Sequence, residues 1–404
     1  MNILILTSVY KDPSLGTSDR STNIVNSFVK EWVKQGHSVL VIHNSHSYPR
    51  IIHQIPKRIK KFLEARMGFP ILDYEAVRKK TYIDNGASIF RVPIKKYIPH
   101  SKPNNYIIKK QTKIINDIIS RLNFKPDVIT GHWVSPQLEL ISELKKTYDC
   151  RTAIVLHGTG YLGSRNYNVN DYLQNIDSIG ARSTSQAIEI KKILGLNKLP
   201  FVCYSGIPDE YLEKYSLNLE KFNDIDEWRI TFVGRLVSYK NIDSIIRALS
   251  TINTIKWKFN IVGDGGEMKK LKELTEELDC SDKVKFWGRV SRDTVMDILK
   301  ETHIFSMIST NEVFGLVYLE AMAASCITIA SKKGGVDGII RNEFNGYLCE
   351  QENNDELNKI LMHIMNTEYN KLIDIAEKGY NTVINYSDNN VAVDYLNNIV
   401  NYFR

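Results

Sequence analysis

The sequence predicts an α/β fold built from two domains, each with a parallel sheet. At 404 residues the chain exceeds the usual size of a single hydrophobic core. It opens with an apolar strand at residues 3–6, an amphipathic helix at 21–35 and a second strand at 38–42. This order is typical of a parallel sheet with helices on its faces. The same alternation starts again with a strand at 228–233, which predicts a second sheet of the same kind.

The composition predicts an ordinary globular protein. Hydrophobic residues make up 43% of the chain and charged residues 25%, which gives no reason to expect disorder. The five cysteines are scattered, without the spacing of a zinc site or a disulfide framework, so we expect reduced thiols. The first residues do not resemble a cleavable leader, and no run of about 18 apolar residues occurs. We therefore expect a cytoplasmic protein without a membrane span.

The positive charge is concentrated in one segment of the first domain. The net charge is +7, and from Arg50 to Lys113 there are 16 lysines and arginines against 4 acidic residues. Drawn as a helix, residues 55–66 place apolar side chains on one side (Ile55, Ile59, Phe62, Leu63) and mostly basic ones on the other. Such a helix is attracted to anionic lipid, which predicts peripheral attachment to a membrane surface. The alternative is a solvated helix that packs on its own domain. Nucleic acid is not expected as a partner, because no recognised binding module accompanies the charge.

A predicted phosphate site lies between residues 311 and 330. Glu312 precedes a predicted helix at 315–324, and Glu320 lies inside that helix. The first turn of a helix leaves backbone N–H groups unpaired at the positive end of the helix dipole, here near Phe314, Gly315 and Leu316. Such a helix start suits a phosphate. A bound phosphate would bring sugar-sized groups within reach of both carboxylates.

Two cations follow the first strand of the second domain. Arg235 and Lys240 lie five residues apart in the loop between the strand at 228–233 and the next helix. An arginine fork and a lysine point charge in this position can hold a diphosphate. The alternative is a pair of solvated basic residues.

These two stretches carry a resemblance to a known family. The pattern E-x-F-G-L-x-x-x-E-A-M-A from Glu312 and the pattern G-R-L-V-x-x-K-N from Gly234 resemble motifs of the retaining glycosyltransferases of family GT4. The resemblance implies the GT-B fold, with two Rossmann-like α/β/α domains facing across a cleft and a C-terminal helix that crosses back to the first domain. We expect these domains at 1–204, together with the helix at 387–404, and at 205–386.

The resemblance also implies a reaction and the residues that serve it. A sugar would pass from a nucleotide-diphosphate-sugar donor to an acceptor with retention at the anomeric carbon. Arg235 and Lys240 would offset the charge of the leaving diphosphate. Glu312 would bond the hydroxyls of the donor sugar, and Glu320 those of the ribose. His157, after the strand at 152–156, would contact the donor sugar. Further donor-binding positions are Gly16, Gly234, Gly263, Gly265, Arg289, Val290, Phe314, Gly315 and Leu316. No protein base, cofactor or metal ion is implied.

Two other features favour different roles. His132, after the strand at 127–130, is interpreted as structural, with a catalytic role as the alternative. Asp224-Ile225-Asp226 spells the D-x-D of metal-dependent glycosyltransferases, which needs acids at the carboxyl end of a strand. Here the acids precede a strand, inside a polar stretch at 213–227 that we interpret as a linker or surface excursion.

Three positions depart from the family pattern. Gly338 stands where a glutamate is usual, and Ser325 and Ile327 replace a glycine and a proline. These departures affect packing and the loop near the nucleotide base, so the base contacts are the least defined part of the expected site.

The expected partners are a UDP- or GDP-sugar donor and a glycan or lipid-linked acceptor. We expect a role in bacterial surface polysaccharide assembly (capsule, exopolysaccharide or O-antigen), peripherally at the inner face of the plasma membrane. Two other functions stay open. A GT-B-fold nucleotide-sugar epimerase would share the donor site, and a non-catalytic GT-B partner subunit would usually lack the cations or the glutamates.

Overall fold

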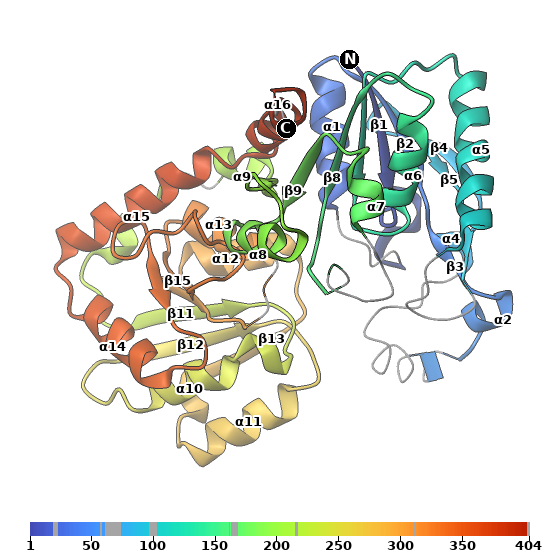
Figure 1. Ribbon diagram of the computed structural model, residues 1–404. Helices are drawn as coiled ribbons and strands as arrows, with labels where there is room; N and C mark the ends of the chain where they lie inside the picture. Colours follow the sequence, from blue (N-terminus) through green and yellow to red (C-terminus); the bar gives the residue numbers. More distant parts are fainter. Residues whose placement is uncertain are drawn as a thin grey trace. The chain divides into compact units, whose positions relative to one another are not determined.

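The computed structural model describes residues 1–18, 23–56, 59–60, 74–96, 103–160, 162, 169–214, 217–310, 312 and 314–401. The chain divides into two compact units (Figure 1). The first consists of Met1–Arg182, Gln186–Cys203 and Ala392–Arg404, and the second of Ser183–Ser185 and Tyr204–Val391. The chain leaves the first unit at Cys203, beside the predicted domain boundary at residue 204.

The first unit contains an eight-stranded sheet in the order β10-β9-β8-β7-β1-β2-β5-β4. Neighbouring strands are parallel, except for the antiparallel pair of β4 and β5. The strand order reverses at β1, because β2 lies on one side of it and β7 on the other. The strands are β1 Asn2–Thr7, β2 Ser38–His43, β4 Lys80–Asp84, β5 Ala87–Arg91, β7 Val128–His132, β8 Arg151–Val155, β9 Ser178–Ala181 and β10 Phe201–Val202, and a separate pair joins β3 His46–Ser47 to β6 Ile94–Lys95.

Amphipathic helices supply the rest of the first core. The apolar side of α1 (Ile24–Lys34) is buried, with Phe28 and Trp32 at its centre. The central strands read as continuous apolar runs because they are buried on both faces. The other helices that lie wholly or mainly in this unit are α2 Arg50–His53, α4 Tyr74–Val77, α5 Asn105–Arg121, α6 Gln137–Lys145, α7 Asn170–Leu173 and α8 Thr184–Leu194.

The C-terminal helix α16 (Asp388–Asn401) returns to the first unit. The indole Nε1 of Trp32 donates to the carbonyl oxygen of Ala392 at 2.8 Å. The hydroxyl of Tyr395 lies 2.6 Å from Oγ1 of Thr130 on β7. Trp32 and Tyr395 are both buried, so these bonds fix α16 against α1 and the sheet. This is the return that the predicted fold requires.

The second unit contains a six-stranded parallel sheet in the order β13-β12-β11-β14-β15-β16. The strands are β11 Trp228–Val233, β12 Trp257–Val262, β13 Val284–Gly288, β14 Ile304–Met307, β15 Ile327–Ser331 and β16 Tyr347–Cys349. The helices are α9 Asp209–Lys214, α10 Ile242–Ser250, α11 Met268–Glu277, α12 Arg292–Lys300, α13 Leu316–Ala323, α14 Asn354–Met365 and α15 Tyr369–Ile384. The strands at 228–233 and the helix near 315–324 thus agree with the sequence prediction.

The described part of the polar stretch at 213–227 packs on the second unit, which agrees with a surface excursion and not with a linker. It contains a short 3-10 helix, Glu220–Phe222, whose Phe222 is only 2% exposed in the second core. Next to it, Nζ of Lys221 donates to the carbonyl oxygen of Ala324 at 2.7 Å. The buried ring of Phe222 holds the stretch on the domain. A single buried residue produces no periodic pattern, so the sequence did not show this contact.

The basic segment of the first unit is described only in part. The predicted basic amphipathic helix at 55–66 lies mostly outside the described residues, which include only 55–56 and 59–60 of it. Within the described part, the first turns of α5 expose Tyr106, Lys109, Lys110 and Lys113. In the ranges that the structure describes, no helix is long and apolar enough to cross a membrane.

The five cysteines are unpaired and buried, in agreement with the expected reduced thiols. Burial raises the pKa of Cys150 and of Cys203 to about 11.

Candidate active site

The fold brings the two predicted motifs of the second unit to one edge of its sheet. The strand order reverses between β11 and β14, so the loops that follow these strands leave the carboxyl edge side by side. Parallel sheets bind ligands at such a reversal. Several bonds join the loops. Among them, the N–H of Thr310 donates to the carbonyl oxygen of Tyr239 at 2.9 Å, and the side-chain amide of Asn241 donates to that of Ile308 at 2.9 Å.

Lys240 and Glu312 form an ion pair at this edge. Nζ of Lys240 donates to Oε2 of Glu312 and lies 3.6 Å from Sδ of Met307. The Lys240 side chain is 10% exposed and that of Glu312 is 16% exposed. Because water reaches neither charge freely, each depends on the other for its compensation. The sequence motifs gave these residues separate roles and did not predict their contact.

Arg235 lies in the same loop but in a different setting. Its side chain is exposed, and its Nη2 lies 3.4 Å from the hydroxyl of Tyr239. In the part of the chain that the structure describes, no carboxylate pairs with Arg235. Its guanidinium therefore has the charge and the fork geometry to receive an anion.

Helix α13 starts beside this pair. Gly315 precedes it with a φ of 77°, and a Cβ there would lie 2.7 Å from the ring of Tyr318. The hydroxyl of Tyr318 donates to the carbonyl oxygen of Met307 at 2.6 Å. Burial, and then the charge of Glu312, raise the pKa of Tyr318 well above its usual value, so the hydroxyl stays protonated. The backbone N–H groups of Gly315 and Leu316 have no backbone acceptor within the described ranges, as the predicted phosphate site requires.

Gly263 and Gly265 allow the loop after β12 to lie directly on the loop after β11. A Cβ on Gly263 would be 1.8 Å from the carbonyl oxygen of Gly234, and one on Gly265 would be 2.2 Å from that of Leu236. The N–H of Leu236 donates to the carbonyl oxygen of Asp264 at 3.1 Å. Close backbone packing thus accounts for these glycines by itself. Their contact with a nucleotide stays a prediction.

Glu320 is buried inside α13 and paired with a residue that the sequence did not single out. Nη2 of Arg292, in the first turn of α12, donates to Oε1 of Glu320. The guanidinium of Arg292 also lies 4.8 Å from the ring centre of Tyr211. The side chain of Ser291 caps α12 by accepting a hydrogen bond from the N–H of Thr294. Because serine is a common cap residue, the sequence could have predicted that Arg292 lies in the first turn of a helix. No sequence signal shows that α12 packs beside α13.

Arg289 and Val290 lie in the turn between β13 and α12. The side chain of Arg289 is exposed and that of Val290 is partly buried. Gly288 before them has a φ of 65°, a backbone conformation that favours glycine. This turn follows the carboxyl end of β13, the edge of the sheet on which Lys240 and Glu312 lie.

In the first unit, His132 and His157 are in direct contact. Nδ1 of His132 lies 2.9 Å from Nε2 of His157. The ring of His157 stacks on that of Trp133 with centres 4.2 Å apart. Burial and the charge of Arg182 lower the pKa of His132 to about 3 and that of His157 well below its usual value. Both rings are therefore neutral at physiological pH, and His132 is linked to a site residue by its bond to His157.

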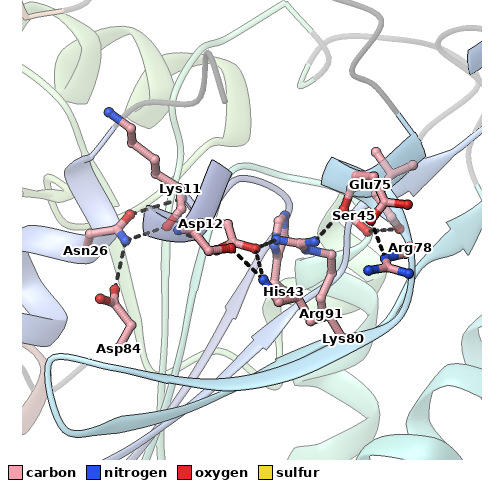
Figure 2. Close-up of polar contacts among 12 residues, drawn as sticks. Lys11, Asp12, Asn26, His43, Ser45, Glu75, Arg78, Lys80, Asp84 and Arg91 are labelled. Atoms are coloured by element: carbon pink, nitrogen blue, oxygen red, sulfur yellow. Dashed lines mark hydrogen bonds and ion pairs between the residues drawn. The ribbon is translucent and has the colours of Figure 1, made fainter. Parts of the chain in front are cut away.

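The loop after β1 is fastened by a cluster of charges, which the sequence did not predict (Figure 2). Asp12 accepts hydrogen bonds from Nη2 of Arg91 at 2.8 Å and from Nζ of Lys80 at 2.7 Å. Asp12 and Arg91 are each about 1% exposed. Burial alone would raise the pKa of Asp12, but the bonds from Lys80, Ser14 and Arg91 outweigh it and hold that pKa well below its usual range.

Further bonds fasten the same loop to the hairpin of β4 and β5. The hydroxyl of Tyr10 donates to Oδ2 of Asp84 at 2.7 Å. The side-chain amide of Asn26 donates to Oδ2 of Asp84 and to the carbonyl oxygen of Lys11 (Figure 2). Gly16 lies just beyond, in the 3-10 helix Pro13–Ser18. These bonds therefore hold in place the part of the loop that precedes Gly16, the predicted donor-binding glycine.

The D-x-D acids lie away from the carboxyl edges. Asp224 and Asp226 precede β11, and Asp226 pairs with Lys256 at 3.1 Å, with both side chains exposed. Within the described ranges, no three His, Cys, Asp or Glu side chains converge as a metal-binding group.

Comparisons with known proteins relate the chain to glycosyltransferases. Residues 218–382 match the family described as glycosyl transferases group 1. The chain is 27% identical over 323 residues to an uncharacterized glycosyltransferase of Methanocaldococcus jannaschii, covering 78% of this chain and 84% of that protein. It is 28% identical over 235 residues to the N-acetyl-alpha-D-glucosaminyl L-malate synthase of Bacillus anthracis, covering 55% of this chain and 61% of that enzyme.

Among solved structures, the chain resembles HepE of Anabaena in complex with UDP. The TM-score is 0.65 at 16% identity, and the match covers 99% of this chain and all of the other (100%). At 16% identity, this similarity shows the fold alone. It confirms the fold class that the sequence predicts, GT-B.

Proposed function

We propose that this chain, which belongs to the group 1 glycosyltransferases, moves a sugar from a nucleotide-diphosphate-sugar donor to a glycan or lipid-linked acceptor, with retention at the anomeric carbon. One observation carries the proposal: Arg235, the Lys240–Glu312 pair and the start of α13 meet at the strand reversal of the second sheet. This arrangement offers cationic and N–H groups to a diphosphate and a carboxylate to a sugar.

In the reaction, the bond between the anomeric carbon and the phosphate oxygen breaks, and its electron pair goes to the diphosphate. Arg235, Lys240 and the N–H groups of Gly315 and Leu316 would stabilise that growing negative charge. The acceptor hydroxyl attacks from the same face of the sugar, and its proton passes to the departing phosphate oxygen. We propose that these groups suffice without a divalent ion, so activity in excess EDTA should equal activity in Mg²⁺.

We propose complementary tasks for the two residues of the ion pair. Glu312 accepts hydrogen bonds only, which suits the hydroxyls of the donor sugar. Lys240 would hold the carboxylate in place and face the diphosphate as well. In the ground state its charge is already compensated by Glu312, so it can respond to the extra negative charge that develops as the bond breaks.

Glu320 would bind the ribose hydroxyls of the nucleotide. Its Oε1 is fixed by Arg292, which orients the carboxylate from the side of α12. We propose a UDP-sugar as the first donor to test, because the HepE structure contains UDP and the relative from Bacillus anthracis is named as an N-acetylglucosaminyl enzyme.

The decisive experiment is a thermal-shift screen of UDP, GDP, ADP and CMP without metal. One diphosphate should raise the Tm of the parent protein clearly more than that of Arg235→Ala or Glu320→Ala. Arg247→Ala, an exposed arginine on α10, is the matched control and should keep the shift. If no nucleotide changes the Tm at millimolar concentration, the donor site is wrongly assigned. The nucleotide found names the sugar donors for transfer assays.

We further propose that the acceptor is held at an anionic membrane surface, in the assembly of a bacterial surface polysaccharide. The supporting observation is the exposed start of α5, where Tyr106 stands beside three lysines (Lys109, Lys110, Lys113). Basic side chains beside an exposed aromatic ring suit an anionic interface.

A flotation assay with vesicles of anionic and of neutral lipid tests this attachment. The parent should float with anionic vesicles at low salt, and a variant with glutamine at all three α5 lysines should float less. The control replaces Lys269, Lys270 and Lys272 of α11 by glutamine. No flotation of the parent at low salt would contradict membrane attachment without affecting the donor site.

A further inference from the structure

A row of hydrogen bonds runs from the C-terminal helix to His157. Oγ1 of Thr130 lies 2.6 Å from the hydroxyl of Tyr395. That hydroxyl lies 3.3 Å from Nε2 of His132, whose Nδ1 lies 2.9 Å from Nε2 of His157. Thr130, His132 and Tyr395 are each at most 1% exposed, whereas His157 is partly exposed.

The number of protons decides the direction of these bonds. Thr130 and Tyr395 each have one hydroxyl proton, and a neutral imidazole has one N–H. Tyr395 is the only partner of the Thr130 hydroxyl within the described ranges, so that buried proton is satisfied only if Thr130 donates to Tyr395. Tyr395 must then donate to Nε2 of His132. His132 carries its proton on Nδ1 and donates it to Nε2 of His157.

The opposite direction leaves a buried donor without an acceptor. If His157 donated to His132, His132 to Tyr395 and Tyr395 to Thr130, the Thr130 proton would have no acceptor among the described residues. In the remaining arrangement, Thr130 and His132 would both donate to Tyr395. The Tyr395 proton would then have no acceptor among the described residues. Buried donors without acceptors are costly and rare.

We propose that Tyr395 and His132 are positioning residues that fix the proton of His157 on Nδ1, so that His157 is a neutral hydrogen-bond donor to a substrate oxygen and not a base. The lone pair of its Nε2 is occupied by the bond from His132. This role rests on the proposed transfer reaction, whereas the position of the proton does not.

Three observations support the assignment. Burial lowers the pKa of both histidines, so each ring carries one proton. The stack on Trp133, at an angle of 18° between ring planes, holds the His157 ring in one orientation. Within the described ranges, Nδ1 of His157 has no hydrogen-bond partner of its own, so its N–H is available to a ligand.

The C-terminal helix thereby takes part in the site. Tyr395 is held by aromatic contacts with Phe28, whose ring centre is 5.0 Å away, and with Trp32 at 5.2 Å. The bond from Trp32 to Ala392 fixes the helix one turn earlier. Tyr395→Phe preserves this packing and removes only the hydroxyl.

Nuclear magnetic resonance of protein labelled with ¹⁵N in the histidine rings tests the proton position directly. The spectra separate protonated from unprotonated ring nitrogens, and His157→Gln identifies the signals of His157 among those of the 9 histidines. We expect the proton on Nδ1 of His157 in the parent and a mixture of tautomers in Tyr395→Phe. Thr130→Val should keep the parental tautomer, because Tyr395 can then donate only to His132. A parent protein with the proton on Nε2 of His157 would overturn the proposal.

Kinetics test the role separately. Tyr395→Phe should lower kcat about 10-fold, the size of one hydrogen bond, and leave the Kd of UDP within about twofold. Tyr148→Phe is the matched control, since it also removes a tyrosine hydroxyl of the first unit, the one that donates to Oδ1 of Asn116 at 3.0 Å, and should leave kcat unchanged. An unchanged kcat together with a changed tautomer would overturn the role of His157 but not the proton assignment. Absence of any transfer by the parent would contradict the proposed function, while the resonance result would stand.

Discussion

The ammonium of Lys240 contacts the carboxylate of Glu312 across 72 residues of sequence. The contact arises because β11 and β14 are neighbours in the sheet although two strands separate them in the chain. It joins the two sequence patterns into one site. It also means that changing either residue alters the charge balance of the other.

Substitutions of Glu312 and of Lys240 should affect UDP binding and kcat in different ways. Glu312→Gln leaves Lys240 without its anion, so we expect a loss of about 1–2 kcal/mol in the free energy of unfolding. UDP should bind as tightly as before or more tightly, because the diphosphate can then take the whole charge of Lys240, while kcat falls at least 100-fold. Lys240→Met should weaken UDP binding and lower kcat together. Calorimetry and initial rates distinguish the two patterns, and weaker UDP binding by Glu312→Gln would contradict this division of tasks.

Glu320 should discriminate between a nucleotide and a bare diphosphate. Because the proposed contact is with the ribose, Glu320→Ala should weaken the binding of UDP about 10-fold, the value of one or two hydrogen bonds. The binding of inorganic pyrophosphate should not change. Glu276→Ala, an exposed glutamate on α11, serves as the control for both ligands. Equal losses for UDP and pyrophosphate would place Glu320 at the diphosphate instead.

Gly263 should not tolerate any side chain. Its φ is 136°, and a Cβ there would lie 1.8 Å from the carbonyl oxygen of Gly234, so Gly263→Ala must push two loops apart. We expect a loss of about 3 kcal/mol or more in stability, measured by urea unfolding. Gly266→Ala is the matched control in the same loop. No atom lies within 4 Å of a Cβ at that position, and its effect should be small.

The Asp12 cluster should make stability depend on pH in the acid range. The bonds that it accepts hold the pKa of Asp12 below its unfolded value, so its contribution is complete above about pH 4 and is lost as the pH falls toward the lower folded value. Asp12→Asn should therefore cost about 2–3 kcal/mol at pH 7, and this difference from the parent should shrink below about pH 4. Unfolding by urea across this pH range measures it.

A surface carboxylate provides the control for that experiment. Asp226 pairs with Lys256, and their side chains are 85% and 70% exposed. Asp226→Asn should change the stability by less than about 0.5 kcal/mol at any pH. An Asp12→Asn variant with the same small, constant effect would contradict the idea that this cluster fastens the loop after β1.

The sequence predicted the fold class, the two largely parallel sheets and the loops in which the two motifs of the second unit lie. It could do so because buried strands are continuous apolar runs, and because a strand followed by a glycine, an arginine and a helix start is a local pattern. It did not determine the partners of charged side chains. Arg292 beside Glu320, Arg91 beside Asp12 and Tyr395 beside His132 come from elements far apart in the chain.

Those pairings follow from strand order and helix packing, which only the tertiary structure decides. The stretch at 213–227 shows the same limit, since one buried phenylalanine holds it on the domain without any sequence period. Local sequence patterns indicate the helix or strand in which a residue lies and the side of it that is buried. The charge compensation and hydrogen bonding of a buried group depend on which other elements the fold brings against it.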